Sequence, residues 1–168
     1  MPEPEVWLRG PLVDVAPLLQ PAAHSLVQSR EEVEQLLPPL TPPQIWRAPH
    51  GAATVGFHVR HAIGSLDRLL TYARGAVLSD AQLQVLAQEA QPDPDLSAGP
   101  LLAAFQAGVA RALDQLRETD ERTLTEVRLV GRGKLPSTVI GLLFHAAEHT
   151  QRHVGQAMST ARLVRGGP

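Results

Sequence analysis

The strongest constraint on the fold is that most of the chain divides into long stretches of helical periodicity, separated by segments rich in proline and glycine. In these stretches apolar residues recur at intervals of three and four, as in helices that bury one face. The spacing predicts four long helices, over residues 22–37, 53–74, 100–118 and from 136 or 137 to about 163. Such a pattern is typical of an all-α protein folded as a four-helix bundle.

The connections between these helices carry signals of their own. Ser79 can cap a short additional helix over residues 79–90, in the connection between the second and third long helices. The proline-rich segment 38–51 is not expected to sustain a helix, but it is expected to place Ile45 and Trp46 at the edge of the core. The bundle is therefore expected to have one crossover connection with a helix of its own.

At 168 residues with 43% hydrophobic content, the chain is long enough for one domain with a core, and we expect a single domain over residues 1–168. Residues 1–16 are expected to form an extended arm, and residues 164–168 a frayed tail. Residues 123–136 alternate briefly between apolar and polar and contain two glycines, which allows a short strand or an extended loop.

Composition excludes several classes of function. The formal net charge of -2, from 15 basic and 17 acidic residues, provides no positive excess for binding nucleic acid. No apolar run approaches the roughly 18 residues of a membrane span, and the first ten residues lack the pattern of a signal peptide, so we expect a cytoplasmic protein. Because the chain has no cysteine, a bound metal must be held by nitrogen and oxygen.

The last predicted helix carries His145, His149 and His153 at intervals of four, which places all three on one face. The outer two lie about 12 Å apart along the axis, too far to share one ion that needs nitrogen at about 2.0–2.1 Å. Either adjacent pair can chelate an ion, with His58 or His61 of the second helix as the third ligand. The spacing does not choose between the pairs, and it leaves open haem binding or a polar cluster without metal.

Other residues near the histidines limit which kind of metal site the chain can form. No glutamate has a histidine three residues later, which excludes the di-iron site of ferritin-like bundles. Glu148 projects about 100° away from its neighbour His149, so it is not expected to be a ligand, and Asp67 is expected to be solvated beside Arg68. Three glycines lie within the predicted helices, Gly64, Gly141 and Gly155. Each costs about 1 kcal/mol of helix stability relative to alanine, and close helix approach or space around a metal would explain this cost.

Two segments carry the histidine pattern, VGFHVRHAIGSLDRLLTYARG at residues 55–75 and HAAEHTQRHVGQ at residues 145–156. Together they resemble the DinB/YfiT-like family of metal-dependent bundles. The resemblance extends from about residue 22 to residue 161, and its specific part is the histidine pattern. It implies a four-helix bundle of the up-down-down-up type. The family includes thiol-dependent S-transferases and the metal-binding domain of mycothiol-dependent maleylpyruvate isomerase.

In that family, one histidine of the second helix and a His-x-x-x-His pair of the last helix hold the metal. By resemblance these ligands are His61, which precedes AIGS, and the pair His149 and His153, which precedes GQ. The family metal is commonly zinc or nickel, and nitrogen ligands suit either. The residues that would surround the metal or line its pocket are His58, His145, Arg60, Arg152 and Gln156. His24 and His50 stand apart from the pattern and receive no role.

The resemblance also implies an activity, the addition of a low-molecular-weight thiol such as bacillithiol, mycothiol or glutathione to a small electrophile. A divalent cation lowers the pKa of a coordinated thiol, and with no cysteine in the chain the sulfur would arrive with the cosubstrate. The same site could instead acidify water, as in a metal-dependent hydrolase. A non-catalytic metal-binding or stress-response protein is the other alternative. In each case the resemblance implies a homodimer.

Overall fold

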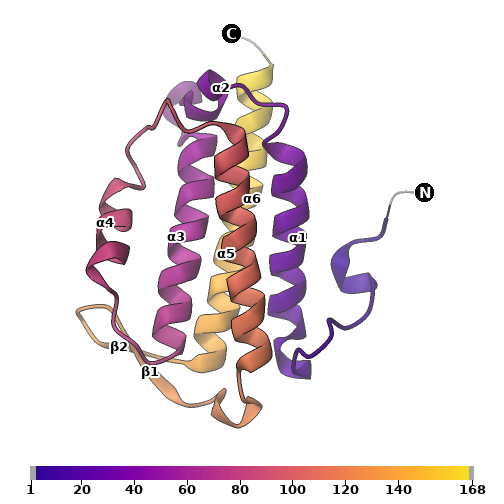
Figure 1. Ribbon diagram of the computed structural model, residues 1–168, viewed down its shortest axis with the longest axis vertical. Helices are drawn as coiled ribbons and strands as arrows, with labels where there is room; N and C mark the ends of the chain where they lie inside the picture. Colours follow the sequence, from indigo (N-terminus) through magenta and orange to yellow (C-terminus); the bar gives the residue numbers. More distant parts are fainter. Residues whose placement is uncertain (1–2, 167–168) are drawn as a thin grey trace.

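The computed structural model describes residues 3–166 and has four long helices side by side (Figure 1). They are α1 (Gln20–Leu36), α3 (Val55–Ala73), α5 (Ala98–Glu118) and α6 (Val139–Arg165). Following the colours of Figure 1 along the chain, α1 and α6 run in one direction and α3 and α5 in the other. The predicted all-α, four-helix bundle of the up-down-down-up type is confirmed. Among residues 3–166, no helix is both long enough and apolar enough to span a bilayer.

Shorter elements lie in the connections. They are η1 (Val6–Leu8), η2 (Pro17–Leu19), α2 (Pro42–Trp46), η3 (Pro49–Gly51), α4 (Asp80–Gln88), η4 (Glu121–Thr123), β1 (Val127–Val130) and β2 (Leu135–Thr138). The helix expected between the second and third long helices is α4, and the Ser79 hydroxyl accepts a hydrogen bond from the Gln82 N–H at its start. The strand allowed by the sequence is present as an antiparallel hairpin, in which Val127 pairs with Thr138.

The bundle core is aliphatic. Its largest fully buried side chains come from every long helix and from α2, and they include Leu26, Ile45, Val59, Phe105 and Leu143. Burying one such side chain contributes about 1.5–3 kcal/mol, so the apolar stripes read from the sequence account for the assembly of the helices. The α3 and α6 helices, which carry the histidines, lie against each other within this core (Figure 1).

Two local predictions about helix boundaries were wrong. The segment 38–51 does contain a helix, α2, because Thr41 and Gln44 form a capping box in which Gln44 Oε1 accepts from the Thr41 N–H at 2.9 Å. Ile45 is buried and Trp46 partly buried, as expected. The last helix begins at Val139, not at 136 or 137, because residues 135–138 pair with β1 as strand β2.

The predicted frayed tail is also wrong over residues 164–165. Helix α6 continues to Arg165, Val164 is buried, and Arg165 Nη2 donates to the Leu36 carbonyl at 3.0 Å. The predicted arm is irregular from residue 3 to residue 16 apart from η1, and the Val6 N–H there donates to Gln28 Oε1 at 3.1 Å. The parts of these two predictions at residues 1–2 and 167–168 lie outside the described residues.

Candidate metal centre

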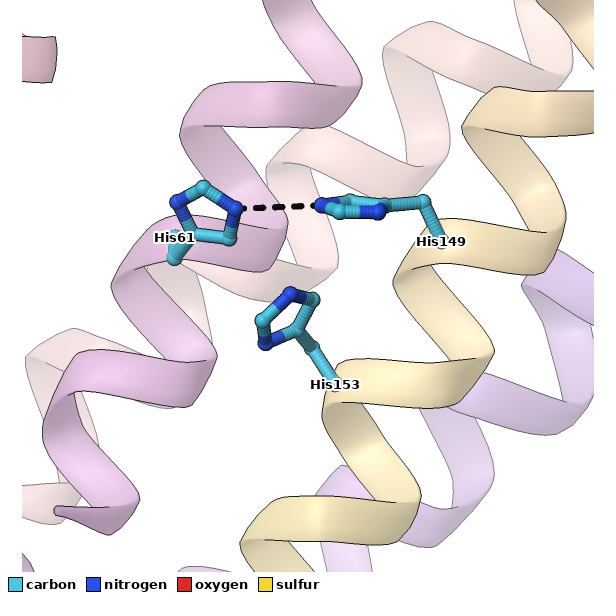
Figure 2. Close-up of side chains that lie close together, drawn as sticks. All are labelled: His61, His149 and His153. Carbon is cyan, nitrogen blue, oxygen red and sulfur yellow. Dashed lines mark hydrogen bonds between the residues drawn. The ribbon is translucent and has the colours of Figure 1, made fainter. Parts of the chain in front are cut away.

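Three histidine rings converge between α3 and α6 (Figure 2). His61 comes from α3, and His149 and His153 come from successive turns of α6. The Nε2 atoms of His61 and His149 are 3.0 Å apart, and one nitrogen from each of the three rings lies within 4.8 Å of the others. Nitrogens about 2.0–2.1 Å from one tetrahedral ion lie roughly 3.3 Å from each other. The structure therefore brings three nitrogens together, and the pair from His61 and His149 lies at a spacing close to that of a single ion's ligands.

A buried carboxylate fixes the orientation of His61. Glu89, directly after α4, is 3% exposed, and its Oε2 accepts a hydrogen bond from His61 Nδ1 at 2.8 Å. Arg68 holds the same carboxylate with both Nη atoms. A hydrogen on Nδ1 leaves the lone pair of His61 on Nε2, the atom that faces His149. The sequence analysis did not identify Glu89 or Arg68 as part of this site.

The Glu89 side chain carries a negative charge despite its burial. Burial raises its pKa, but hydrogen bonds from His61 and Arg68 and the charge of Arg68 together bring the pKa below its usual value. A carboxylate behind a ligating imidazole increases the basicity of the ring and holds it in one orientation. This arrangement is commonly found behind histidines that bind metals.

Gly64 makes room for this carboxylate. A Cβ atom at position 64 would lie 1.9 Å from Glu89 Oε1, so any other residue there would displace the Glu89 side chain. This agrees with the expectation that helix glycines provide space around the centre. At Gly141, a Cβ would lie 3.0 Å from the capping Thr138 Oγ1, and at Gly155 it would meet nothing within 4 Å, so neither gives space to the histidines.

His58 and His145 lie outside the group of three. His58 is 7% exposed, and its Nδ1 is 3.1 Å from His153 Nδ1. His145 has a half-exposed side chain, and its Nδ1 lies 3.3 Å from Glu148 Oε2. His58 is thus a neighbour of His153, whereas His145 belongs to the surface of α6.

The environment favours neutral imidazoles. Burial, followed by the charges of neighbouring histidines and Arg152, lowers the pKa of His153 to about 4. Burial is also the first cause that lowers the pKa of His58 and that of His149. Neutral rings retain the lone pair that a metal ion needs, so burial prepares these side chains for coordination.

Two arginines predicted to line the site are placed differently. Arg152 Nη2 donates to Glu148 Oε2 at 2.9 Å and lies 3.2 Å from His149 Nδ1, directly beside the histidines. Arg60 instead lies 5.9 Å from the centroid of the Trp46 ring and donates to the Gln91 carbonyl. Of the two arginines, only Arg152 therefore lies beside the converging histidines, and it is paired there with Glu148.

The remaining polar residues lie apart from the centre. Gln156 is exposed, and no hydrogen bond joins it to the histidines within residues 3–166. Asp67 was expected to be solvated beside Arg68, but it is partly buried and accepts from Gln82 Nε2 at 2.6 Å, because Arg68 turns to Glu89. His24 Nε2 lies 3.0 Å from the Gly10 carbonyl oxygen, and His50 is exposed in η3.

Comparison with known proteins identifies the family. The family model of the DinB superfamily matches residues 25–157. The chain belongs to the DinB superfamily. The resemblance inferred from the histidine pattern is therefore confirmed, and the matched range contains all three converging histidines.

A DinB-type fold is also found among solved structures. The crystal structure of a conserved protein from Enterococcus faecalis is similar, with a TM-score of 0.69 and 23% identity over 88% of this chain and 97% of that one. At this level of identity, the structural similarity shows a shared fold and nothing further. None of the curated proteins compared with the chain matches it.

Proposed function

We propose that this DinB-superfamily protein binds one divalent metal ion, zinc or nickel, through His61, His149 and His153. The observation that carries the proposal is the convergence of three imidazole nitrogens within 4.8 Å, from two helices of the bundle. The donor set fits the ion, because neutral imidazoles bind either metal readily. Glu89 further supports it by holding His61 through Nδ1.

The number of ligands favours a reactive site over a purely structural one. Structural zinc sites usually have four protein ligands, whereas catalytic sites have three and leave a position for water or substrate. His145 is half exposed and lies near Glu148, and His58 is not a member of the group of three. Three protein ligands would therefore leave one coordination position on the ion for water or substrate.

The activity proposed for this site is transfer of a low-molecular-weight thiol to a small electrophile. A divalent ion bound there would lower the pKa of a coordinated thiol and favour the nucleophilic thiolate. Because the chain contains no cysteine, the sulfur must come from the cosubstrate. Arg152, beside His149, is suitably placed to attract a carboxylate of a thiol such as glutathione or bacillithiol.

A thiol-conjugation assay tests this activity. The full-length protein, loaded with zinc or nickel, is mixed with glutathione, bacillithiol or mycothiol and with monochlorobimane as the electrophile. The expected result is a metal-dependent rate that is lost in His153→Ala and kept in His145→Ala, a matched histidine on the same helix. An equal rate without metal, or in His153→Ala, would contradict the proposal.

Two alternatives are distinguished by a companion assay with an ester substrate. A metal-dependent hydrolase would cleave an activated ester such as p-nitrophenyl acetate without thiol, and His153→Ala would abolish the cleavage. A non-catalytic metal-binding or stress-response bundle would bind the ion with no turnover of either substrate. We also propose a homodimer, which light scattering coupled to size exclusion would exclude if only an 18.1 kDa species were found.

A further inference from the structure

A second concave site lies at the other end of α3 from the histidines. It is the hairpin groove, which we define as the hollow between the end of α3, the loop and start of α4 that follow it, and the β1 strand with its turn at residues 131–134. In Figure 1 these elements meet at the lower left of the molecule. Tyr72, in the groove, follows His61 by eleven residues of α3, or about 16 Å along the axis.

The groove has the size and lining of a small-molecule site. Its volume is about 640 Å³, and small-molecule sites are typically hollows of about 300–1,000 Å³ with mostly apolar walls. Tyr72, Val77, Leu83, Val127 and Leu129 supply these walls from three separate segments. Val77 is 87% exposed and Leu129 53%, so the apolar surface is open to a ligand.

The charges around the groove have one sign. Arg128, Arg132 and Lys134 line it, and no carboxylate of the described residues, 3–166, does. Arg128 is already engaged, since its Nε donates to the Ala73 carbonyl and its Nη2 pairs with Glu126 at 2.9 Å. Within residues 3–166, Arg132 and Lys134 form no salt bridge, which leaves two cations at the hairpin turn for a ligand anion.

We propose that the hairpin groove binds a small amphipathic carboxylate, an aryl or medium-chain aliphatic acid. The apolar body of the ligand lies against Tyr72, Leu83 and Leu129, and its carboxylate lies between Arg132 and Lys134. The hollow shape suits a compact ligand better than a flat membrane surface. This site is separate from the histidine centre and does not depend on the metal.

Calorimetric titration of the full-length protein with decanoate, and with decan-1-ol as the uncharged match, tests the proposal. We expect decanoate to bind at least about tenfold more tightly than decanol, because only the acid can pair with the two cations. Arg132→Glu and Leu129→Asp are each expected to weaken decanoate binding at least about tenfold. Two exposed positions outside the groove serve as matched controls, Arg47→Glu and Val13→Asp, and both are expected to bind like the wild type.

Several outcomes would overturn the inference. These are no decanoate binding, equal binding of acid and alcohol, or unchanged binding in Arg132→Glu with circular dichroism showing that the variant is folded. Binding to phosphatidylglycerol vesicles but not to decanoate would assign the groove to a membrane surface. A dimer that Leu129→Asp dissociates, without decanoate binding, would assign it to a second copy. Decanoate binding retained in His153→Ala supports a site independent of the metal, whereas its loss there would place the acid at the histidines.

Discussion

Helix α3 is flanked by α6 and by α4, and the two contacts are built from different kinds of residue. Against α6, α3 contributes to the aliphatic core, with Val59 and Leu143 both 1% exposed. Against α4 the contact is polar, because no residue of Asp80–Gln88 is buried. Instead Gln82 donates to Asp67 and Thr71, and Glu89 accepts from Arg68 and His61.

This difference shows how the candidate centre is assembled. The three converging histidines stand on helices held by apolar burial, which is insensitive to the loss of any one hydrogen bond. The carboxylate that orients His61 comes from the crossover connection, which is held by a polar network. A buried polar network is strong only when every member has its partner. The three converging histidines, proposed to bind a metal, and the carboxylate that supports His61 should therefore respond differently to substitution.

The largest expected effect is on the free energy of unfolding, from truncation in the aliphatic core that α3 and α6 share. Leu143→Ala is expected to lower it by about 2–5 kcal/mol, because a cavity replaces a fully buried side chain. Leu86→Ala, at a residue of α4 that is 44% exposed, is the matched control and should change the free energy of unfolding by less than about 0.5 kcal/mol. Urea denaturation measures both, and equal losses would contradict the distinction between the two contacts.

The next largest effect is expected from removal of the Glu89 carboxylate, which supports His61. Glu89→Ala leaves Arg68 without its partner and His61 without its acceptor, so metal affinity should fall by about 10–100-fold. Hydrogen exchange should show residues 80–88 losing protection while α6 keeps it. Gln88→Ala, at the exposed neighbouring position, is the control for both measurements. An unchanged metal affinity together with lost protection of residues 80–88 would limit Glu89 to a structural role.

Gly64→Ala tests the same support from the α3 side. Because the new Cβ would overlap Glu89 Oε1, the substitution should displace the carboxylate and weaken metal binding as Glu89→Ala does. The double variant should be no weaker than either single one, since both remove the same contact. Isothermal titration with zinc measures this, and additive losses would show that Gly64 acts by another route.

The smallest effect is expected at Gly155, where the same substitution meets open space. Gly155→Ala should raise the free energy of unfolding by about 1 kcal/mol through helix propensity, with metal affinity unchanged. Thermal denaturation of the metal-free protein checks the gain. A lower free energy of unfolding would show that position 155 packs against a group that is not near it in the structure of residues 3–166.

The sequence predicted most of the bundle, because the four apolar stripes set both the helices and the faces that they bury. It also indicated which histidines share a face, and the family pattern then selected His61, His149 and His153. The errors were a short helix missed in a connection and the two ends of the last helix. The α2 helix is only five residues long, and its capping box lies within a run of prolines that suggested irregular chain. Strand β2 occupies residues that a continuing helical pattern had assigned to α6.

The support for His61 could not be predicted, because Glu89 follows it by 28 residues and no local periodicity connects them. Two signals were present. Gly64 lies about one turn after His61, on the same face of the helix. A glycine there leaves room for a side chain from another segment. Glu89 is an acidic residue near the end of the short helix predicted over residues 79–90. Neither signal identifies the partner of the other until the crossover connection is placed in space.

The most direct test of the metal centre is elemental analysis of protein purified without an affinity tag, as wild type, His149→Ala and His145→Ala in parallel. The account predicts about one equivalent of zinc or nickel per chain in the wild type and in His145→Ala, and its loss in His149→Ala. A wild type without metal after incubation with both ions, or His149→Ala that retains a full equivalent, would contradict it.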